Sequence, residues 1–337
     1  MTTPQPQPMP DPMPDPMSEL MSSTTHDVAV IGGSVAGLSA ALVLGRARRR
    51  VAVIDDGTPR NAPAAHLHSF LSRDNSSPAE LLAIGRAEVT GYGGELIADR
   101  AVSVHGAIDG FTVELASGRT VTARRLLLAT GVRDQLPDVP GIQERWGVDV
   151  VHCPYCFGFE VADQPVGVLG AGGNPARKAL TIRHWSADTT LFLQAAAVLS
   201  AAEQERLEAN GVAVVRDAVT GLVVDDDRLT GVRLASGAVH NIAALFLTPR
   251  CFLRDEPFAA LGLVTEDGAL GTAVITDPTG LTSVAGVWAA GSVTNPGAQL
   301  IHAAASGSRA AIAMNNDMIQ RDADRRLGTA EGRLQHA

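Results

Sequence analysis

The sequence predicts an α/β protein with two Rossmann-like, three-layer domains. Two glycine-rich turns, in DVAVIGGSVAG and in VGVLGAGG, each join an apolar strand to a helical segment. Each unit is followed by alternating apolar stretches and then by a continuous apolar strand, LLLAT or ALFLT, suited to a buried parallel sheet. Because 337 residues are enough for two domains, an internal duplication of a dinucleotide-binding fold explains this pattern.

The N-terminal segment, residues 1–25, is predicted to be a disordered leader. It repeats Pro, Met, Gln and Asp and contains no Lys or Arg, which excludes an ordinary secretory signal. Three cysteines do not make a disulfide framework, so we expect a cytoplasmic protein. No stretch approaches about 18 apolar residues in a row, so no membrane span is expected. The net charge of −9 argues against nucleic acid as a partner.

The first glycine-rich unit has the layout of a dinucleotide site. The strand 28–31 leads into the turn GGSVAG, a helix, a second strand and then an acidic residue. Gly32 allows the tight turn and Gly37 allows the helix to pack closely on the strand. Ser34 replaces the usual middle glycine, but it is small and can add a hydroxyl donor. Asp55 lies 23 positions after Gly32, where a carboxylate can bind ribose hydroxyls.

The second glycine-rich unit keeps the fold signal but lacks the binding chemistry. Gly170 and Gly172 fit the first two glycine positions, whereas Pro175 stands at the third. Its second strand ends in Gln194 instead of an acid, and no arginine follows before Arg206 to hold a 2′-phosphate. We therefore expect this unit to be a vestigial nucleotide-binding domain.

The stretch HCPYCFGFE contains two of the three cysteines. A zinc site needs about four ligands, but Cys251 stands alone and His152 is too close to Cys153 to indicate one. A static disulfide across so short a loop adds little stability. Redox exchange is therefore favoured, and no metal is expected. Pro154 suits the first turn of a helix, whose positive end would lower the pKa of the Cys153 or Cys156 thiol.

Several motifs together resemble the low-molecular-weight thioredoxin reductases. They are GGSVAG, LLLATG, LPDVPG, the CPYC pair before the second nucleotide unit, and GVWAAGSVTNPGAQLIHAAASG, and the resemblance covers about residues 26–320. It implies a homodimer that binds FAD in a discontinuous domain interrupted by a pyridine-nucleotide-like domain. The implied segments are 27–147 and 248–320 for FAD, 148–247 for the inserted domain, and 321–337 as a C-terminal tail.

The resemblance also implies which residues contact FAD. They are Gly32, Gly33, Ser34, Gly37, Asp55, Asn61, His68, Val102, Thr130, Gly131, Gly291, Ser292, Gln299 and Leu300. Two residues besides Ser34 depart from the family pattern. Ser292 stands where Asp or Asn is usual, and Phe157 stands where the family places a residue that can move a proton.

Within this family the chain looks most like the dithiol oxidases that close disulfides in metabolites of the gliotoxin, holomycin and romidepsin type. The residues that carry this likeness are GTPRNAPAAHLHSFLSRD and CPYC followed by Gly-aromatic-Glu. The likeness implies that Cys153 exchanges with a small-molecule dithiol and that Cys156 faces FAD. Oxygen would be the electron acceptor, with hydrogen peroxide as product and no need for NADPH. His302 is the first candidate for the acid/base residue and His152 is the second.

Three functions are compatible with these patterns. The favoured hypothesis is an FAD-dependent dithiol oxidase. The second is an NADPH-dependent disulfide reductase of the thioredoxin reductase type. The third is a flavin-holding scaffold or redox sensor without turnover, which only Ser34, Phe157 and Ser292 support.

Overall fold

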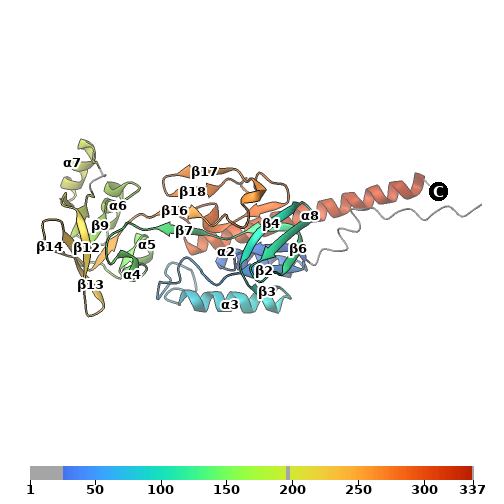
Figure 1. The fold of residues 1–337 in the computed structure, drawn as a ribbon, viewed down its shortest axis with the longest axis horizontal. Helices are drawn as coiled ribbons and strands as arrows, with labels where there is room; N and C mark the ends of the chain where they lie inside the picture. Colours follow the sequence, from blue (N-terminus) through green and yellow to red (C-terminus); the bar gives the residue numbers. More distant parts are fainter. Residues whose placement is uncertain (1–25, 195–197, 336–337) are drawn as a thin grey trace, which may run out of the picture.

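The computed structural model describes residues 26–194 and 198–335, with side chains up to Leu327. The predicted leader, residues 1–25, lies outside the described residues. Two lobes are joined by a pair of strands, β7 (Val132–Gln135) and β16 (Arg250–Leu253), as Figure 1 shows. In the described part of the chain, no helix is long and apolar enough to span a membrane.

The first lobe is built on a sheet with a parallel centre. Its path runs β3-β2-β1-β6-β5-β4, and β19 also pairs with β6. The parallel strands are β1 (His26–Ile31), β2 (Val51–Asp55), β3 (Glu95–Ala98), β6 (Thr120–Leu128) and β19 (Val287–Ala289). The antiparallel strands are β4 (Ala101–Ala107) and β5 (Gly110–Leu115). Because β19 comes from the late part of the chain, this lobe is assembled from two distant segments.

Helices cover one face of this sheet. They are α2 (Val35–Arg46), α3 (Pro78–Gly91) and α8 (Leu300–Gln335). A buried cluster joins side chains of all three helices to the strand residues Val28, Val30, Val51 and Val53. The alternate strand residues, such as Ala29 and Ile31, point to the other face and pack with the β4–β5 meander. These layers match the predicted Rossmann-like unit.

The second lobe holds a fully parallel sheet. Its strand order is β11-β10-β9-β15-β8. The strands are β8 (Val150–Val151), β9 (Val166–Leu169), β10 (Thr189–Phe192), β11 (Ala213–Val215) and β15 (Ala244–Phe246). Three antiparallel strands cover one side, namely β12 (Val219–Asp225), β13 (Arg228–Leu234) and β14 (Val239–Asn241). The helices are α4 (Ile142–Arg145), α5 (Pro154–Phe157), α6 (Pro175–Ile182) and α7 (Ala201–Ala209).

The connecting strands belong to a small sheet of their own. Strand β7 pairs antiparallel with β16, and β18 (Gly271–Val274) and β17 (Thr265–Gly268) complete its order β17-β18-β16-β7. Two short 3₁₀ helices, η1 (Ala259–Leu261) and η2 (Gly291–Val293), follow in the first lobe.

The packing moves one expected boundary. Ile142 is fully buried in a cluster of the second lobe, and Leu136, Val139 and Trp146 pack against the same cluster. The sequence had grouped these residues with the first FAD segment, up to residue 147. We propose instead that the inserted domain begins after β7.

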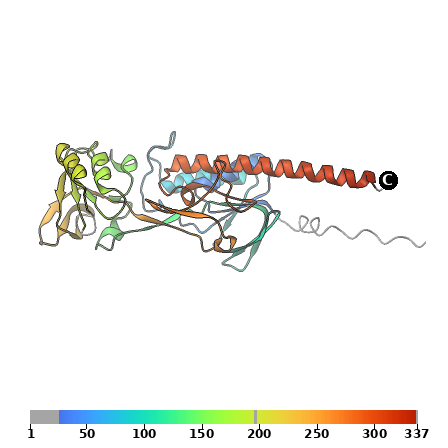
Figure 2. The ribbon, with the colours of Figure 1, turned by 90° about the horizontal axis from the view of Figure 1, so that it is seen from above.

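The last helix is longer than expected. Helix α8 continues through position 321 to Gln335 and extends beyond the body of the first lobe (Figure 2). Asp322 pairs with the buried Arg124 at 2.5 Å, and Asp317 pairs with the fully buried Arg125 at 2.9 Å. The expected C-terminal tail, 321–337, stays a prediction; in its described part, the ion pair of Asp322 with Arg124 holds the helix against β6.

Candidate active site

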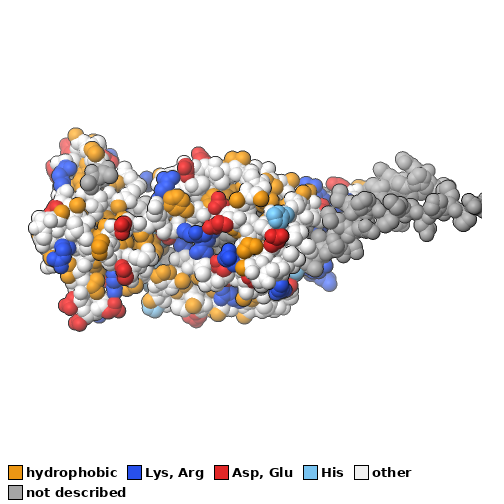
Figure 3. All heavy atoms as spheres, in the orientation of Figure 1, with side chains coloured by type: hydrophobic (Ala, Val, Ile, Leu, Met, Phe, Trp, Pro, Cys, Tyr) orange, Lys and Arg blue, Asp and Glu red, His pale blue; other side chains and the backbone are white. Residues whose placement is uncertain are grey.

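A cavity of about 970 Å³ is lined by residues of both lobes. The first lobe contributes the glycine-rich turn after β1 and the start of α8, and the second lobe contributes the CPYC segment. The surface around the lobes mixes charges of both signs, without a continuous field of one sign on the visible face (Figure 3). Because the glycine-rich turn and the CPYC segment share this cavity, we take the cavity as the candidate active site.

The glycine-rich turn after β1 packs so closely on neighbouring segments that side chains would clash there. Gly32 has a φ of 109°, and a Cβ there would lie 2.3 Å from the carbonyl oxygen of Ala129. A Cβ on Gly33 would lie 2.8 Å from Asp55. Gly37 has a different role, because a Cβ there would come within 1.9 Å of the Gly32 carbonyl oxygen. It therefore permits close helix–strand packing, as the sequence indicated.

Unpartnered polar atoms face the cavity on this side. Ser34 is the N-cap of α2, yet its side chain makes no capping hydrogen bond. Among the described residues, the buried Thr130 Oγ1 and Arg254 Nε have no hydrogen-bond partner, and both residues line the cavity. Buried polar groups normally have partners. An anionic dinucleotide lying over the N-terminus of α2 would supply them, so these residues fit FAD.

Asp55 lies at the end of β2, where a ribose was expected. Its carboxylate accepts a hydrogen bond from the Gly33 N–H at 3.1 Å and pairs with Arg86 at 3.0 Å. A carboxylate has about four acceptor positions, so two remain for ribose hydroxyls.

Most of the expected site residues line this one cavity. Of the expected FAD contacts, the lining includes Gly32, Gly33, Ser34, Asp55, Asn61, His68, Thr130, Gly131, Gly291, Ser292, Gln299 and Leu300. The expected catalytic residues Cys153, Cys156, His152 and His302 also line it. Val102 and Gly37 do not. Val102 lies on β4 next to Ala101, which does line the cavity, and its contact with FAD stays a prediction.

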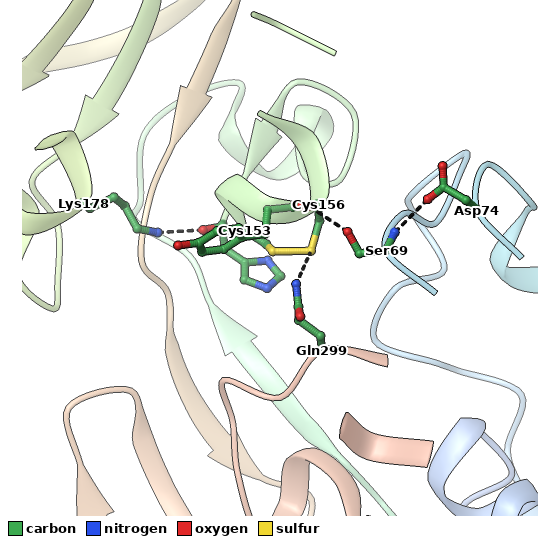
Figure 4. Close-up of a disulfide and its surroundings, with 8 residues drawn as sticks. Ser69, Asp74, Cys153, Cys156, Lys178 and Gln299 are labelled. Carbon is green, nitrogen blue, oxygen red and sulfur yellow. Dashed lines mark hydrogen bonds between the residues drawn. A yellow bond between two sulfur atoms is a disulfide. The ribbon is translucent and has the colours of Figure 1, made fainter. Parts of the chain in front are cut away.

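The two cysteines form a disulfide at the junction of the lobes (Figure 4). Cys153 is the N-cap of α5, and Pro154 occupies the first turn, as predicted. Gln299, just before α8, donates from Nε2 to Cys156 Sγ at 3.9 Å. Ser69 of the first lobe donates to the Tyr155 carbonyl oxygen at 3.4 Å. Both contacts bring Cys156 toward the cofactor side of the cavity.

The disulfide also bears on the zinc alternative. Cysteines joined to each other cannot act as thiolate ligands. Within the described ranges, no group of three or more His, Cys, Asp or Glu side chains is placed to hold a metal ion.

The candidate histidines differ in environment. His152 is exposed to the cavity, and its ring lies 5.8 Å from that of Trp146. Burial, together with the positive charges of Arg60 and Lys178, lowers the pKa of His152 to about 4. It is therefore neutral at neutral pH and a weak proton acceptor. His302 lies in the first turn of α8 and is exposed to the cavity.

His68 was expected to contact the cofactor, but its ring nitrogens face carboxylates. They lie 3.6 Å from Asp74 and 3.3 Å from Glu160, which follows the CPYC helix. His68 therefore connects a loop of the first lobe to the disulfide segment.

A buried ion pair fixes the connecting strands. Arg60 makes two hydrogen bonds to Asp134 of β7, at 2.6 and 2.8 Å, and donates to the Pro296 carbonyl oxygen at 2.8 Å. Cys251 of β16 lies 3.4 Å from both Arg60 and Asp134. Burial raises the pKa of the Cys251 thiol to about 11, so the thiol stays protonated. Cys251 is buried and also lines the cavity.

The second glycine-rich turn carries a side-chain cap and a nearby carboxylate. The Asn174 side chain accepts a hydrogen bond from the Arg177 N–H at the start of α6, and it also contacts Glu203 at 3.2 Å. A Cβ on Gly172 would lie 2.7 Å from the Thr248 carbonyl oxygen. The N-terminus of α6, the part of such a unit that would bind a pyrophosphate, therefore has one N–H already satisfied by a side chain and a carboxylate close by.

Other cavity residues were not expected from the sequence. They are Arg60, Asp134, Glu160, Lys178 and Arg254. Most of them come from strand ends or loops without a recognisable motif. Lys178 is an exception, because it is the only lysine in the sequence. That property distinguishes it without any knowledge of the structure.

A dinucleotide cradle and a cysteine disulfide in one cavity define a flavin-dependent oxidoreductase acting on sulfur groups, with FAD as its cofactor. The pyridine nucleotide-disulphide oxidoreductase model matches residues 26–308. The chain therefore belongs to this family.

Sequence and structural similarity to individual proteins supports this family assignment. The chain is 33% identical to thioredoxin reductase sirT of Leptosphaeria maculans over 314 residues, covering 88% of this chain and 95% of the relative. The crystal structure of HlmI superposes with a TM-score of 0.85 at 48% identity, covering 90% of this chain and 96% of the other. An oxidoreductase from Agrobacterium tumefaciens gives a TM-score of 0.83 at 36% identity, covering 87% and 98%.

Proposed function

We propose that this protein is an FAD-dependent dithiol oxidase that closes a disulfide in a small-molecule dithiol, with oxygen as the electron acceptor. The observation that carries the proposal is the shared cavity: the Cys153–Cys156 disulfide and the cofactor cradle line one space, while a side-chain cap already takes one N–H at the second nucleotide turn. Electrons can thus enter at the sulfurs without a nicotinamide.

The proposed exchange begins at Cys153. A substrate thiolate attacks Cys153 Sγ, the Cys153–Cys156 bond breaks, and its electron pair remains on Cys156. The second substrate thiolate then attacks the substrate sulfur of the mixed disulfide and releases Cys153. The contact of Gln299 with Cys156 Sγ supports this order, because it leaves Cys153 as the sulfur farther from the cofactor segment. Bound FAD would accept the electron pair and pass it to oxygen, giving hydrogen peroxide.

Each dithiol releases two protons, so the chain must provide acceptors. Phe157 has no group that can take a proton. We propose His302 as one acceptor, because it lines the cavity on the cofactor side and an imidazole nitrogen can accept a proton. His152 is the weaker candidate, since the pKa of its imidazole is lowered to about 4.

Oxygen uptake tests the proposal. We expect the holoenzyme to consume oxygen and form hydrogen peroxide with dithiothreitol alone, and NADPH should add nothing. The same preparation carrying Cys153→Ser should lose this activity. A wild-type protein that stays inactive with dithiols until NADPH is supplied would contradict the proposal.

A second candidate is an NADPH-dependent disulfide reductase. The name of the relative sirT, a thioredoxin reductase, favours it. It predicts that NADPH bleaches the flavin under anaerobic conditions. Pro175, the capped start of α6 and the nearby Glu203 argue against that result.

The proposed assembly is a homodimer, and the proposed location is the cytoplasm. Sedimentation of the holoenzyme tests the first, and fractionation of the producing cells tests the second.

A further inference from the structure

Lys178 is the only lysine in the chain; all the other residues among the 27 Lys and Arg are arginines. It lies on α6 of the inserted domain and lines the cavity together with the disulfide. A chain that otherwise uses arginine for positive charge keeps a lysine at this one position. Lysine differs from arginine in being able to lose its proton within the range of ordinary pH.

The contacts of Lys178 place its amine beside the reactive segment. Its Nζ donates to the carbonyl oxygens of His152 and Leu247, both at 2.7 Å. His152 directly precedes Cys153 in the chain, and Figure 4 shows Lys178 reaching toward this segment from the side of the disulfide opposite Ser69. The amine thereby bridges the carboxyl ends of β8 and β15 at the edge of the inserted sheet.

These two contacts suit either protonation state. An ammonium group has three N–H donors, so one remains after the two carbonyls. A neutral amine has two donors and a lone pair, so both carbonyls stay satisfied while the lone pair can accept a proton. Burial lowers the pKa of Lys178 to about 8, close to the ordinary value of about 8.5 for a thiol.

Other charged and titratable groups line the same cavity as Lys178. The cavity wall carries the His152 ring and the cysteine pair after β8, Cys251 on β16, Glu160 after α5, and the Arg60–Asp134 pair at β7. On the same helix, Arg177 is exposed and does not line the cavity. In the described part of the chain, Lys178 makes no ion pair, which leaves its proton available for exchange.

We propose that Lys178 is the second proton acceptor of the dithiol reaction, acting on the Cys153 side of the disulfide. This rests on the proposed dithiol exchange. Neutral Lys178 takes the proton of the first substrate thiol, and the thiolate attacks Cys153 Sγ while the electron pair of the broken disulfide stays on Cys156. The second thiol gives its proton to His302 and its sulfur forms the substrate disulfide. Cys153 leaves as a thiolate and takes the proton back from Lys178, so the dithiol loses two electrons and the enzyme disulfide gains them.

A single lysine allows a direct titration. Incorporating lysine labelled with ¹³C at Cε gives one lysine side-chain signal in the NMR spectrum of the holoenzyme. We expect its midpoint at about pH 8, and we expect reduction of the disulfide to raise it, because a nearby thiolate favours the ammonium. A midpoint near the ordinary value of about 10.4, unchanged by reduction, would overturn the proposal.

Variants test the proton transfer itself. Lys178→Arg keeps the charge and the donors but cannot titrate, whereas Lys178→Met removes both. The rate is measured as anaerobic loss of the Cys153–Cys156 disulfide, so that it depends neither on oxygen nor on the overall direction of turnover. With dithiothreitol, which is mostly protonated at pH 7, we expect Lys178→Arg to be slower than wild type by about a hundredfold.

An acidic dithiol provides the decisive comparison. Benzene-1,2-dithiol is largely ionised at the same pH and needs no base, so the wild-type and Lys178→Arg rates should become similar. The matched control, Arg177→Met, changes the neighbouring exposed residue and should behave as wild type with both dithiols. An equal loss with both dithiols would show a merely structural role and overturn the proposal. Absence of oxygen uptake with normal disulfide exchange would instead count against the oxidase function alone.

Discussion

At the scale of single residues, the two cysteines differ in their surroundings. Gln299 contacts Cys156 from the cofactor lobe, whereas Cys153 begins α5 next to the segment held by Lys178. The two sulfurs therefore have different surroundings, which the sequence does not reveal. We expect them to react at different rates with an external disulfide.

The first prediction concerns this asymmetry. In Cys156→Ser, the remaining Cys153 thiol should form a mixed disulfide with an oxidised small dithiol. In Cys153→Ser, the remaining Cys156 should react at least about tenfold more slowly, because access controls exchange as much as thiolate content does. Intact-mass spectrometry over time measures both rates. Equal rates would show that the assignment of the outer sulfur is wrong.

The second prediction concerns His152 and pH. The pKa of His152 is lowered to about 4 in the folded protein, against about 6.5 for an unfolded histidine. Between these values the unfolded chain binds a proton that the folded chain does not, so stability falls as the pH drops from about 6.5 toward 4. His152→Gln should reduce this loss, seen as a smaller fall in Tm between pH 7.5 and pH 5.

The control for that experiment is a histidine at the surface. His105 has a side chain that is 56% exposed, so His105→Gln should leave the pH dependence of Tm as in wild type. A His152→Gln variant with an unchanged pH dependence would mean that the ring is already protonated or solvated in the folded state.

At the scale of elements, the strands β7 and β16 connect the lobes and bear on how the disulfide is presented. Arg60 of the first lobe holds Asp134 of β7, and the side chain of Asp134 is only 7% exposed. The pair thus fixes the connection where the chain passes between lobes. Loss of the Arg60 side chain would leave the Asp134 carboxylate buried without this partner, which is a costly arrangement.

The third prediction is that Arg60→Ala destabilises the protein by roughly 3 kcal/mol. The matched control is Arg133→Ala on β7, the strand that carries Asp134; in the Arg133–Glu256 pair, both side chains are 58% exposed. That variant should cost less than about 1 kcal/mol, as exposed pairs do. Urea unfolding of the holoenzymes measures the difference. Similar losses in both variants would show that Asp134 finds water or another partner.

At the scale of the whole molecule, α8 connects the cofactor site to a buried charge network. Its first turn carries His302 at the cavity, and two turns of its later part carry Asp317 and Asp322, which pair with Arg125 and Arg124 on β6. The helix is therefore a structural part of the cofactor lobe well beyond the expected end of the domain.

The fourth prediction follows from this network. Truncation after Gln320 removes Asp322 and Arg325 but leaves Arg124 buried, with Asp27 and Asp109 as remaining partners. We expect a loss of roughly 2 kcal/mol. Truncation after Leu327 keeps both residues and should be close to neutral. Thermal unfolding distinguishes the two, and equal stability would mean that the segment beyond 320 is a dispensable tail after all.

The sequence by itself determined the class of fold and the chemistry. Glycine spacing and apolar runs are local signals, because the turn after β1 needs positive φ at Gly32 and a buried parallel strand needs a continuous apolar run. The cysteine spacing likewise placed Cys153 and Pro154 at the start of a helix. The family resemblance then identified FAD and a set of site residues, most of which line the cavity.

Only the tertiary structure decided which distant residues meet at the disulfide. Lys178, Gln299 and Glu160 come from different elements, and no sequence pattern fixes the lobe arrangement that brings them to one cavity. The same holds for the proposed domain boundary after β7 and for the continuation of α8, since both depend on which core a segment packs into. Local patterns specify the elements, whereas burial and long-range charge pairing specify how those elements form a site.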